Sequence, residues 1–306
     1  MSSFSQIDEA RLQRVEMAGL LCWLLKDAGW ALLLPKVSWP AAALALILEI
    51  FSLSCRWRAQ TGTQRVHGTA TFLWLLGNAV WMTGEFLHAP EDKAGVQLPW
   101  HSGPVLAAND HLYMRWVRTA RGIFIAAMAE LLLHYIGSIC SHRKDETDYP
   151  ACLEPTPRAP PQLVMGLFTL EAYEGAFIGP WIAKDICWTF SLFWASLPFA
   201  LVVVALMLDY INIARTGILF QIIELWWVMA NIVWLSAELA LHDEYLWPRI
   251  TAGVILLLGS IVAVFAFWHV KPEKSRVSEV QPSEGSYLFG GSASARTARP
   301  AQDLAA

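Results

Sequence analysis

Charged side chains are scarce in this chain: Lys, Arg, Asp and Glu together make up 16% of its 306 residues. Soluble domains usually carry about 25%, and here the hydrophobic share is 56% with a mean hydropathy of +0.41. This balance argues against a soluble domain and predicts a protein immersed in lipid. The net charge of −4 says little about such a protein, and we predict no nucleic-acid partner.

Cysteine is also scarce, with five residues in the whole chain. Five dispersed cysteines do not make a disulfide framework, so we expect free thiols. The polar N-terminal stretch lacks an apolar core ahead of a small-residue site, and we expect no signal peptide. Phosphate loops, nucleophile elbows and zinc-binding motifs are missing too, which leaves an enzyme as an uncertain and less favoured class.

Long apolar segments are abundant, and each is a candidate membrane span. The sequence predicts an all-α integral membrane protein with about eight transmembrane helices. The expected spans are 14–35, 38–57, 68–88, 114–137, 169–190, 193–211, 217–241 and 248–270.

One segment of the sequence occurs twice. Glu16, Trp23, Lys26, Asp27 and Trp30 are matched by Glu174, Trp181, Lys184, Asp185 and Trp188, each 158 residues further on. Two later patterns also recur in the same order: Trp74, Asn78, Trp81 and Glu85 match Trp227, Asn231, Trp234 and Glu238, and Trp116 and Arg118 match Trp247 and Arg249. We interpret this as a tandem duplication of a four-helix unit.

The predicted organisation follows from the duplication. Residues 1–140 form a first four-helix repeat, 141–164 a polar linker, 165–271 a second repeat and 272–306 a disordered tail. Because each repeat has an even number of spans, the two repeats are parallel. Lys and Arg gather in the loops 57–68 and 138–162 and after residue 270, so we expect cytoplasmic N- and C-termini. Nothing indicates which membrane is involved.

The repeated polar residues fall on single helical faces, and their positions along the spans place them in the outer half of the membrane. We predict one charge-balanced network with tryptophan walls per repeat, because unpaired intramembrane ions are costly. Two interpretations stay open: a polar cavity that serves a solute, and a structural tie between helices. The predicted network comprises Lys26, Asp27, Trp30, Asn78, Trp81, Glu85, Arg118, Lys184, Asp185, Trp188, Asn231, Trp234, Glu238 and Arg249.

Two Glu-x3-His pairs have spacing that can hold a metal on a helix. They are Glu130 with His134 and Glu238 with His242. They fall at opposite ends of the predicted spans, so an interfacial histidine is the favoured interpretation. We predict no metal site and no cofactor.

The strings W-L-L-K-D-A-G-W and N-A-V-W-M-T-G-E-F resemble those of a group of multi-pass membrane proteins that carry K-D-x-x-W and N-x-x-W-M-x-G-E. The resemblance rests on the first repeat, because Met82-Thr83-Gly84 is replaced by Leu235-Ser236-Ala237 in the second. It implies multi-pass architecture and no particular activity.

Three function classes follow for a protein whose first partner is the lipid bilayer. The first is a transporter or channel-like protein for a small polar or ionic solute, supported by the internal repeat and the intramembrane charges. The second is a structural or ligand-sensing membrane protein without flux, supported by the charge balance. The third is a membrane-embedded metal or haem enzyme. The oligomeric state is not indicated.

Overall fold

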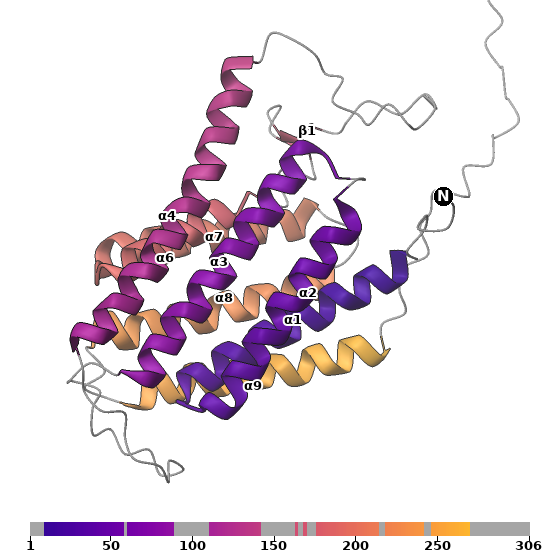
Figure 1. Cartoon of the computed structure of the whole chain (residues 1–306). Coiled ribbons are helices and arrows are strands. Elements are labelled where there is room, and N and C mark those ends of the chain that lie inside the picture. Colours follow the sequence, from indigo (N-terminus) through magenta and orange to yellow (C-terminus); the bar gives the residue numbers. More distant parts are fainter. Residues whose placement is uncertain are drawn as a thin grey trace, which may run out of the picture. The chain divides into compact units, whose positions relative to one another are not determined.

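Figure 1 shows the computed structural model of the chain, which describes residues 9–57, 60–88, 110–141, 163–164, 168–169, 176–213, 218–241 and 246–269. The predicted all-α class is confirmed for these residues, apart from one pair of two-residue strands. The eight helices are α1 (Glu9–Ala31), α2 (Pro35–Arg56), α3 (Gly62–Leu87), α4 (Asp110–Ser141), α6 (Ile178–Thr189), α7 (Phe193–Ile213), α8 (Ile218–Leu239) and α9 (Leu246–His269). Strand β1 (Leu163–Val164) pairs antiparallel with β2 (Phe168–Thr169). The predicted linker lies almost entirely outside the described residues, and the predicted tail lies entirely outside them.

Five of the described helices are long and apolar enough to cross a membrane, namely α2, α4, α7, α8 and α9. Only 17% of the apolar window of α2 is buried, and only 22% in α4 and in α7. Large apolar side chains such as Leu44, Ile47 and Phe51 therefore lie on the surface of the bundle. An apolar surface of this extent suits lipid and not water.

The other three helices, α1, α3 and α6, are not apolar or long enough by the same measure. Helix α1 carries Lys26 and Asp27, and α6 has 12 residues. Twelve residues give about 18 Å of helix, against about 30 Å of hydrocarbon core. Helix α6 is also shorter than predicted, because it begins at Ile178 and not near residue 169.

The helices predicted as first in each repeat occupy the centre of the packing. Helix α1 contacts α2, α8 and α9, whereas α6 contacts α7, α3 and α4. Figure 1 shows α1 beside α9 and α4 beside α6. The last helix of each half (α1–α4 and α6–α9) therefore packs against the first helix of the other half.

The turns α1–α2 and α6–α7 have the same backbone conformation. Leu33 and Ser191, which are 158 residues apart, are the two described non-glycine residues with positive φ, at 54° and 57°. Below each turn a serine of the following helix donates to a lysine carbonyl at 3.0 Å, Ser38 to Lys26 and Ser196 to Lys184. The matching sequence segments thus fold into matching local structure.

Candidate functional site

Two adjacent Lys–Asp pairs lie inside the helix bundle. Lys26 and Asp27 on α1 are 1% and 4% exposed, and Lys184 and Asp185 on α6 are 1% and 2% exposed. Adjacent helical residues point about 100° apart, so helical spacing alone would not pair either lysine with its neighbour. The structure differs: Lys26 contacts the Asp27 carboxylate, and Lys184 Nζ lies 2.6 Å from Asp185 Oδ1. The flexible four-carbon stem of lysine bridges the angle, so each pair is neutral within its own helix.

The second oxygen of each aspartate accepts a hydrogen bond from the other half of the chain. Trp227 Nε1 on α8 donates to Asp27 Oδ2 at 2.6 Å, and Trp74 Nε1 on α3 donates to Asp185 Oδ2 at 2.6 Å. Asn78 Nδ2 makes a longer contact of 3.5 Å with Asp185 Oδ2. Hydrogen bonds to an ionised acceptor are roughly twice as strong as neutral ones. The two halves are therefore joined by a reciprocal pair of tryptophan–aspartate bonds, and not closed within themselves as the sequence predicted.

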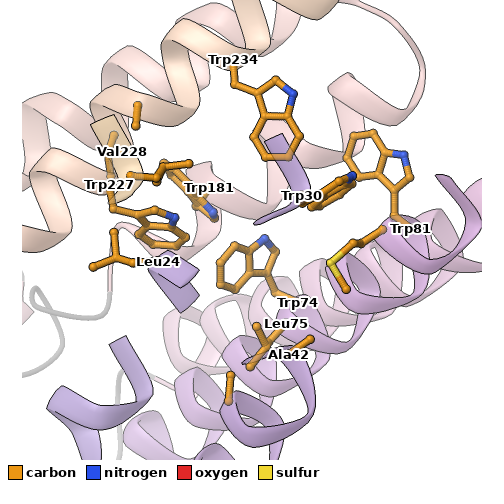
Figure 2. Packing of buried hydrophobic residues seen from close by; sticks show 14 of the residues in the cluster. Leu24, Trp30, Ala42, Trp74, Leu75, Trp81, Trp181, Trp227, Val228 and Trp234 are labelled. Atoms are coloured by element: carbon orange, nitrogen blue, oxygen red, sulfur yellow. The ribbon is translucent and has the colours of Figure 1, made fainter. Parts of the chain in front are cut away.

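Eight tryptophans from α1, α3, α6 and α8 form two layers, one on each side of the aspartates. The first layer is Trp23, Trp74, Trp181 and Trp227, and the second layer is Trp30, Trp81, Trp188 and Trp234. Ring centroids lie 5.0–6.2 Å apart in the first layer. Figure 2 shows Trp74, Trp181 and Trp227 of the first layer beside Trp30, Trp81 and Trp234 of the second.

The second layer is a closed ring. Each indole meets two neighbours edge-to-face, with centroids 4.9–5.6 Å apart and interplanar angles of 83–90°. Edge-to-face aromatic pairs contribute about 0.5–1.5 kcal/mol each beyond their buried area. Lys184 Nζ lies between the layers, 4.1 Å from the Trp181 ring centroid and 4.8 Å from that of Trp188.

Glu85 and Arg249 form a buried ion pair beyond the second layer. Arg249 Nη2 lies 2.6 Å from Glu85 Oε1, and Trp30 Nε1 donates to Glu85 Oε2 at 3.0 Å. Arg249 Nε also donates to the Ala31 carbonyl at 3.0 Å, while Glu238 Oε2 is 4.0 Å from Arg249 Nη1. This arginine from α9 therefore closes a network on α1 and α3 of the other half.

Arg118, predicted as the counterpart of Arg249, is exposed on α4 and outside this network. One turn later, Arg121 contacts the carbonyl of Thr189 and lies 3.3 Å from its hydroxyl oxygen. Thr189 corresponds to Ala31 in the 158-residue register, so Arg121 occupies the place of Arg249. The Trp-x-Arg match in the sequence pointed to Arg118, whereas Arg121 lies on the face of α4 that contacts α6.

Two of the metal candidates, Glu130 and His134, contact threonines of α3. Glu130 accepts a hydrogen bond from Thr69, and His134 Nε2 is 3.1 Å from the Thr63 hydroxyl. His242 lies outside the described residues. Among the described residues, no group of three or more His, Cys, Asp and Glu side chains is arranged to hold a metal ion.

A cavity of about 260 Å³ opens next to the first tryptophan layer, and we call it the vestibule. All four indoles of that layer line it. Its polar lining is Glu16, Glu49, His67, Thr71, Gln221 and Glu224. These residues come from the helix ends opposite the α1–α2 and α6–α7 turns.

The space between the aspartates and the second layer is almost filled. A cavity of about 10 Å³ is lined by Asp27, Asp185, the two asparagines, Glu238 and the second-layer indoles. One water molecule needs roughly 10–15 Å³ on this measure. Nine of the predicted network residues therefore meet at one place between the halves, and that place is nearly filled.

Sequence reasoning did not include the first tryptophan layer or the vestibule in the predicted site. The sequence did contain a signal for this layer, because Trp23 and Trp74 belong to the repeated patterns. Glu49 and Glu224 of the vestibule had no such signal, because these positions differ between the repeats.

Comparison with protein-family models, with curated proteins and with solved structures gives no match for the chain. Its class rests on its own physical features. Five described helices are apolar enough to cross a membrane, and the bundle also buries lysines and aspartates; this combination is compatible with a membrane protein.

Proposed function

We propose that the chain crosses the membrane eight times, as two parallel four-helix repeats. The reciprocal helix contacts, the matching turns at Leu33 and Ser191, and the paired serine–lysine bonds support this. Helices α1, α3 and α6 do not need an apolar surface if protein surrounds them. The short α6 begins where Phe177 and Ile178 line the vestibule, and non-helical backbone at membrane depth is tolerated beside a cavity.

We further propose cytoplasmic N- and C-termini, which puts the vestibule on the cytoplasmic side. The excess of Lys and Arg in the loops on that side supports this orientation. Single-cysteine variants at Gln60 and Leu34, in a background in which the native cysteines are replaced by serine, test it with a membrane-impermeant maleimide. Labelling of Leu34→Cys and not Gln60→Cys in intact cells is expected, and the reverse pattern would overturn the orientation.

The function we propose is passage of a small polar or ionic solute along the axis between the halves. The observation that supports it best is the order of elements on this axis. The vestibule leads to the first tryptophan layer, then to Asp27 and Asp185, then to the closed second layer. A site built equally by both halves, open on one side and closed on the other, is the arrangement that alternating access requires.

A flux assay in proteoliposomes tests this proposal. The double variant Asp27→Asn/Asp185→Asn removes both axial carboxylates, and Glu130→Gln is a matched loss of one carboxylate outside the axis. We expect wild type and Glu130→Gln to carry proton or alkali-cation flux, measured with entrapped pyranine and with currents after Na⁺ or K⁺ jumps. The folded fraction of the double variant should lose flux, although the unpaired Lys26 and Lys184 lower its folded yield. Equal flux in the double variant and wild type would refute the proposal.

A structural or ligand-sensing role without flux is the second candidate. The observation that favours it is the 10 Å³ cavity between the layers, which leaves no room for a solute in this conformation. This role predicts that no wild-type flux occurs. Wild-type flux therefore separates the two candidates.

A further inference from the structure

The vestibule joins two kinds of lining that are seldom found together inside a membrane protein. Its floor is the first tryptophan layer, and its wall carries Glu16, Glu49 and Glu224. Among the described residues that line it, none is Lys or Arg. The acidic side chains of the lining therefore lie beside aromatic faces.

This combination suits an organic cation. Tryptophan is the strongest of the aromatic side chains at attracting a cation to its ring face, and aromatic cages are the usual site for quaternary ammonium groups. Carboxylates add the complementary charge. A compact, strongly hydrated metal ion would instead require oxygen ligands around it, and the vestibule offers mostly carbon surface.

The volume limits the size of the ligand. Pockets for drug-sized molecules occupy about 300–1,000 Å³, and the vestibule has about 260 Å³. The ligand should therefore be smaller than a typical drug molecule.

Part of the polar lining differs between the two halves. By the repeat register, Glu224 stands where the first half has Thr71, and Glu49 stands where the second half has Met207. The tryptophan and aspartate layers below are the same in both halves. The vestibule therefore carries chemistry of its own, beyond the duplicated scaffold.

We propose that the vestibule binds a small organic ammonium compound, held between the first tryptophan layer and Glu16, Glu49 and Glu224. This inference builds on the proposed function by naming a solute class. It concerns binding alone, so it can be tested without any measurement of flux.

The test measures binding to the purified full chain in detergent by equilibrium dialysis, with choline as the probe. The control ligand is 3,3-dimethylbutan-1-ol, which has the same shape and hydroxyl group without the charge. We expect choline to bind at least about tenfold more tightly, a difference of about 1.4 kcal/mol. Acetate, an anion, should not bind.

Three variants locate the site. Glu224→Gln should weaken choline binding about tenfold and leave the neutral alcohol unaffected, because only the charge is lost. Trp181→Phe keeps an aromatic ring and should weaken choline binding several-fold. Glu130→Gln, a carboxylate outside the vestibule, should have no effect. If Glu224→Gln does not fold, Glu49→Gln takes its place with the same expectation.

The outcomes separate this inference from the proposed function. Choline that binds no better than the alcohol, or that ignores both Glu224→Gln and Glu49→Gln, would overturn the vestibule site even if ion flux is found. Choline binding with the expected variant pattern supports the site, and it does so even if every flux assay is negative and transport is ruled out.

Discussion

Substitution of Trp227 by phenylalanine should destabilise the protein by removing one hydrogen bond from a buried carboxylate. Trp227 Nε1 donates to Asp27 Oδ2 at 2.6 Å, and Asp27 is 4% exposed. Water cannot replace the lost donor at that depth without rearrangement of the layer. A hydrogen bond to a charged group contributes about 1.5–3 kcal/mol, so a loss of this size is expected in addition to the effect of the smaller ring.

Another residue of the first tryptophan layer, Trp181, provides the control for this substitution. Trp181 is also buried, and its Nε1 has no hydrogen-bond partner among the described residues. Trp181→Phe therefore causes the same reduction in ring size without the loss of a hydrogen bond. The difference between Trp227→Phe and Trp181→Phe is a lower estimate of the bond to Asp27, because Trp181→Phe also weakens the Lys184 contact. Trp74→Phe, which removes the matching bond to Asp185, should resemble Trp227→Phe.

Thermal unfolding in detergent, followed by thiol-reactive dye or by light scattering, measures this difference. One kcal/mol shifts the midpoint by about 2–4 °C in proteins of 150–250 residues. The expected gap between Trp227→Phe and Trp181→Phe is therefore about 3–12 °C. Midpoints within about 1 °C of one another would refute the reasoning, because the reciprocal bonds would then contribute nothing measurable.

Two further predictions concern the opposite end of the axis. Arg249→Met leaves Glu85 charged and buried without its ion-pair partner, which should cost about 3–5 kcal/mol of stability. Arg118 is exposed, so Arg118→Met should change stability by less than about 0.5 kcal/mol. Equal effects of the two variants in thermal unfolding would contradict the assignment of the ion pair. Ser191→Gly should raise stability by about 0.5–1 kcal/mol, because positive φ is unfavourable for other residues. Leu33→Gly should gain less, because the partly buried Leu33 side chain also loses apolar contacts; a greater gain at Leu33 would contradict this account.

The sequence predicted the helices well because their signals are local. Predicted spans 193–211 and 217–241 correspond to α7 (Phe193–Ile213) and α8 (Ile218–Leu239). The spacing of Trp74, Asn78 and Trp81 also correctly placed one polar face on α3. Such spacing identifies the side of a helix that carries the polar residues, and a run of apolar residues indicates the length of the helix.

The partners of those faces could not be predicted from spacing. Each polar set was expected to close within its own repeat, whereas Trp227 bonds to Asp27 across the two halves. A periodic pattern is the same whichever helix lies opposite, so only packing decides the partner. The Arg118 assignment failed for a related reason: Arg118 and Arg121 are both on α4 next to the matched pattern, and the choice between them depends on burial.

The division of interactions between and within the halves bears on how the closed site opens. Each Lys–Asp pair is neutral within one helix, so separating the halves at this level breaks hydrogen bonds and aromatic contacts and leaves no buried ion unpaired. Two hydrogen bonds to carboxylates contribute about 1.5–3 kcal/mol each, and ring contacts about 0.5–1.5 kcal/mol each. If the buried lysines and aspartates had instead been paired across the halves, separating the halves would cost several kcal/mol per ion.

Glu85 and Arg249 are the exception, because they come from α3 and α9 and form their ion pair across the halves. They lie beyond the second tryptophan layer, on the side opposite the vestibule. A movement that opens this side must break the pair, whereas a movement that widens the vestibule does not. The closed conformation is thus held most strongly at Glu85 and Arg249, and neutralising both together (Glu85→Gln with Arg249→Gln) should favour opening on that side without leaving a buried charge.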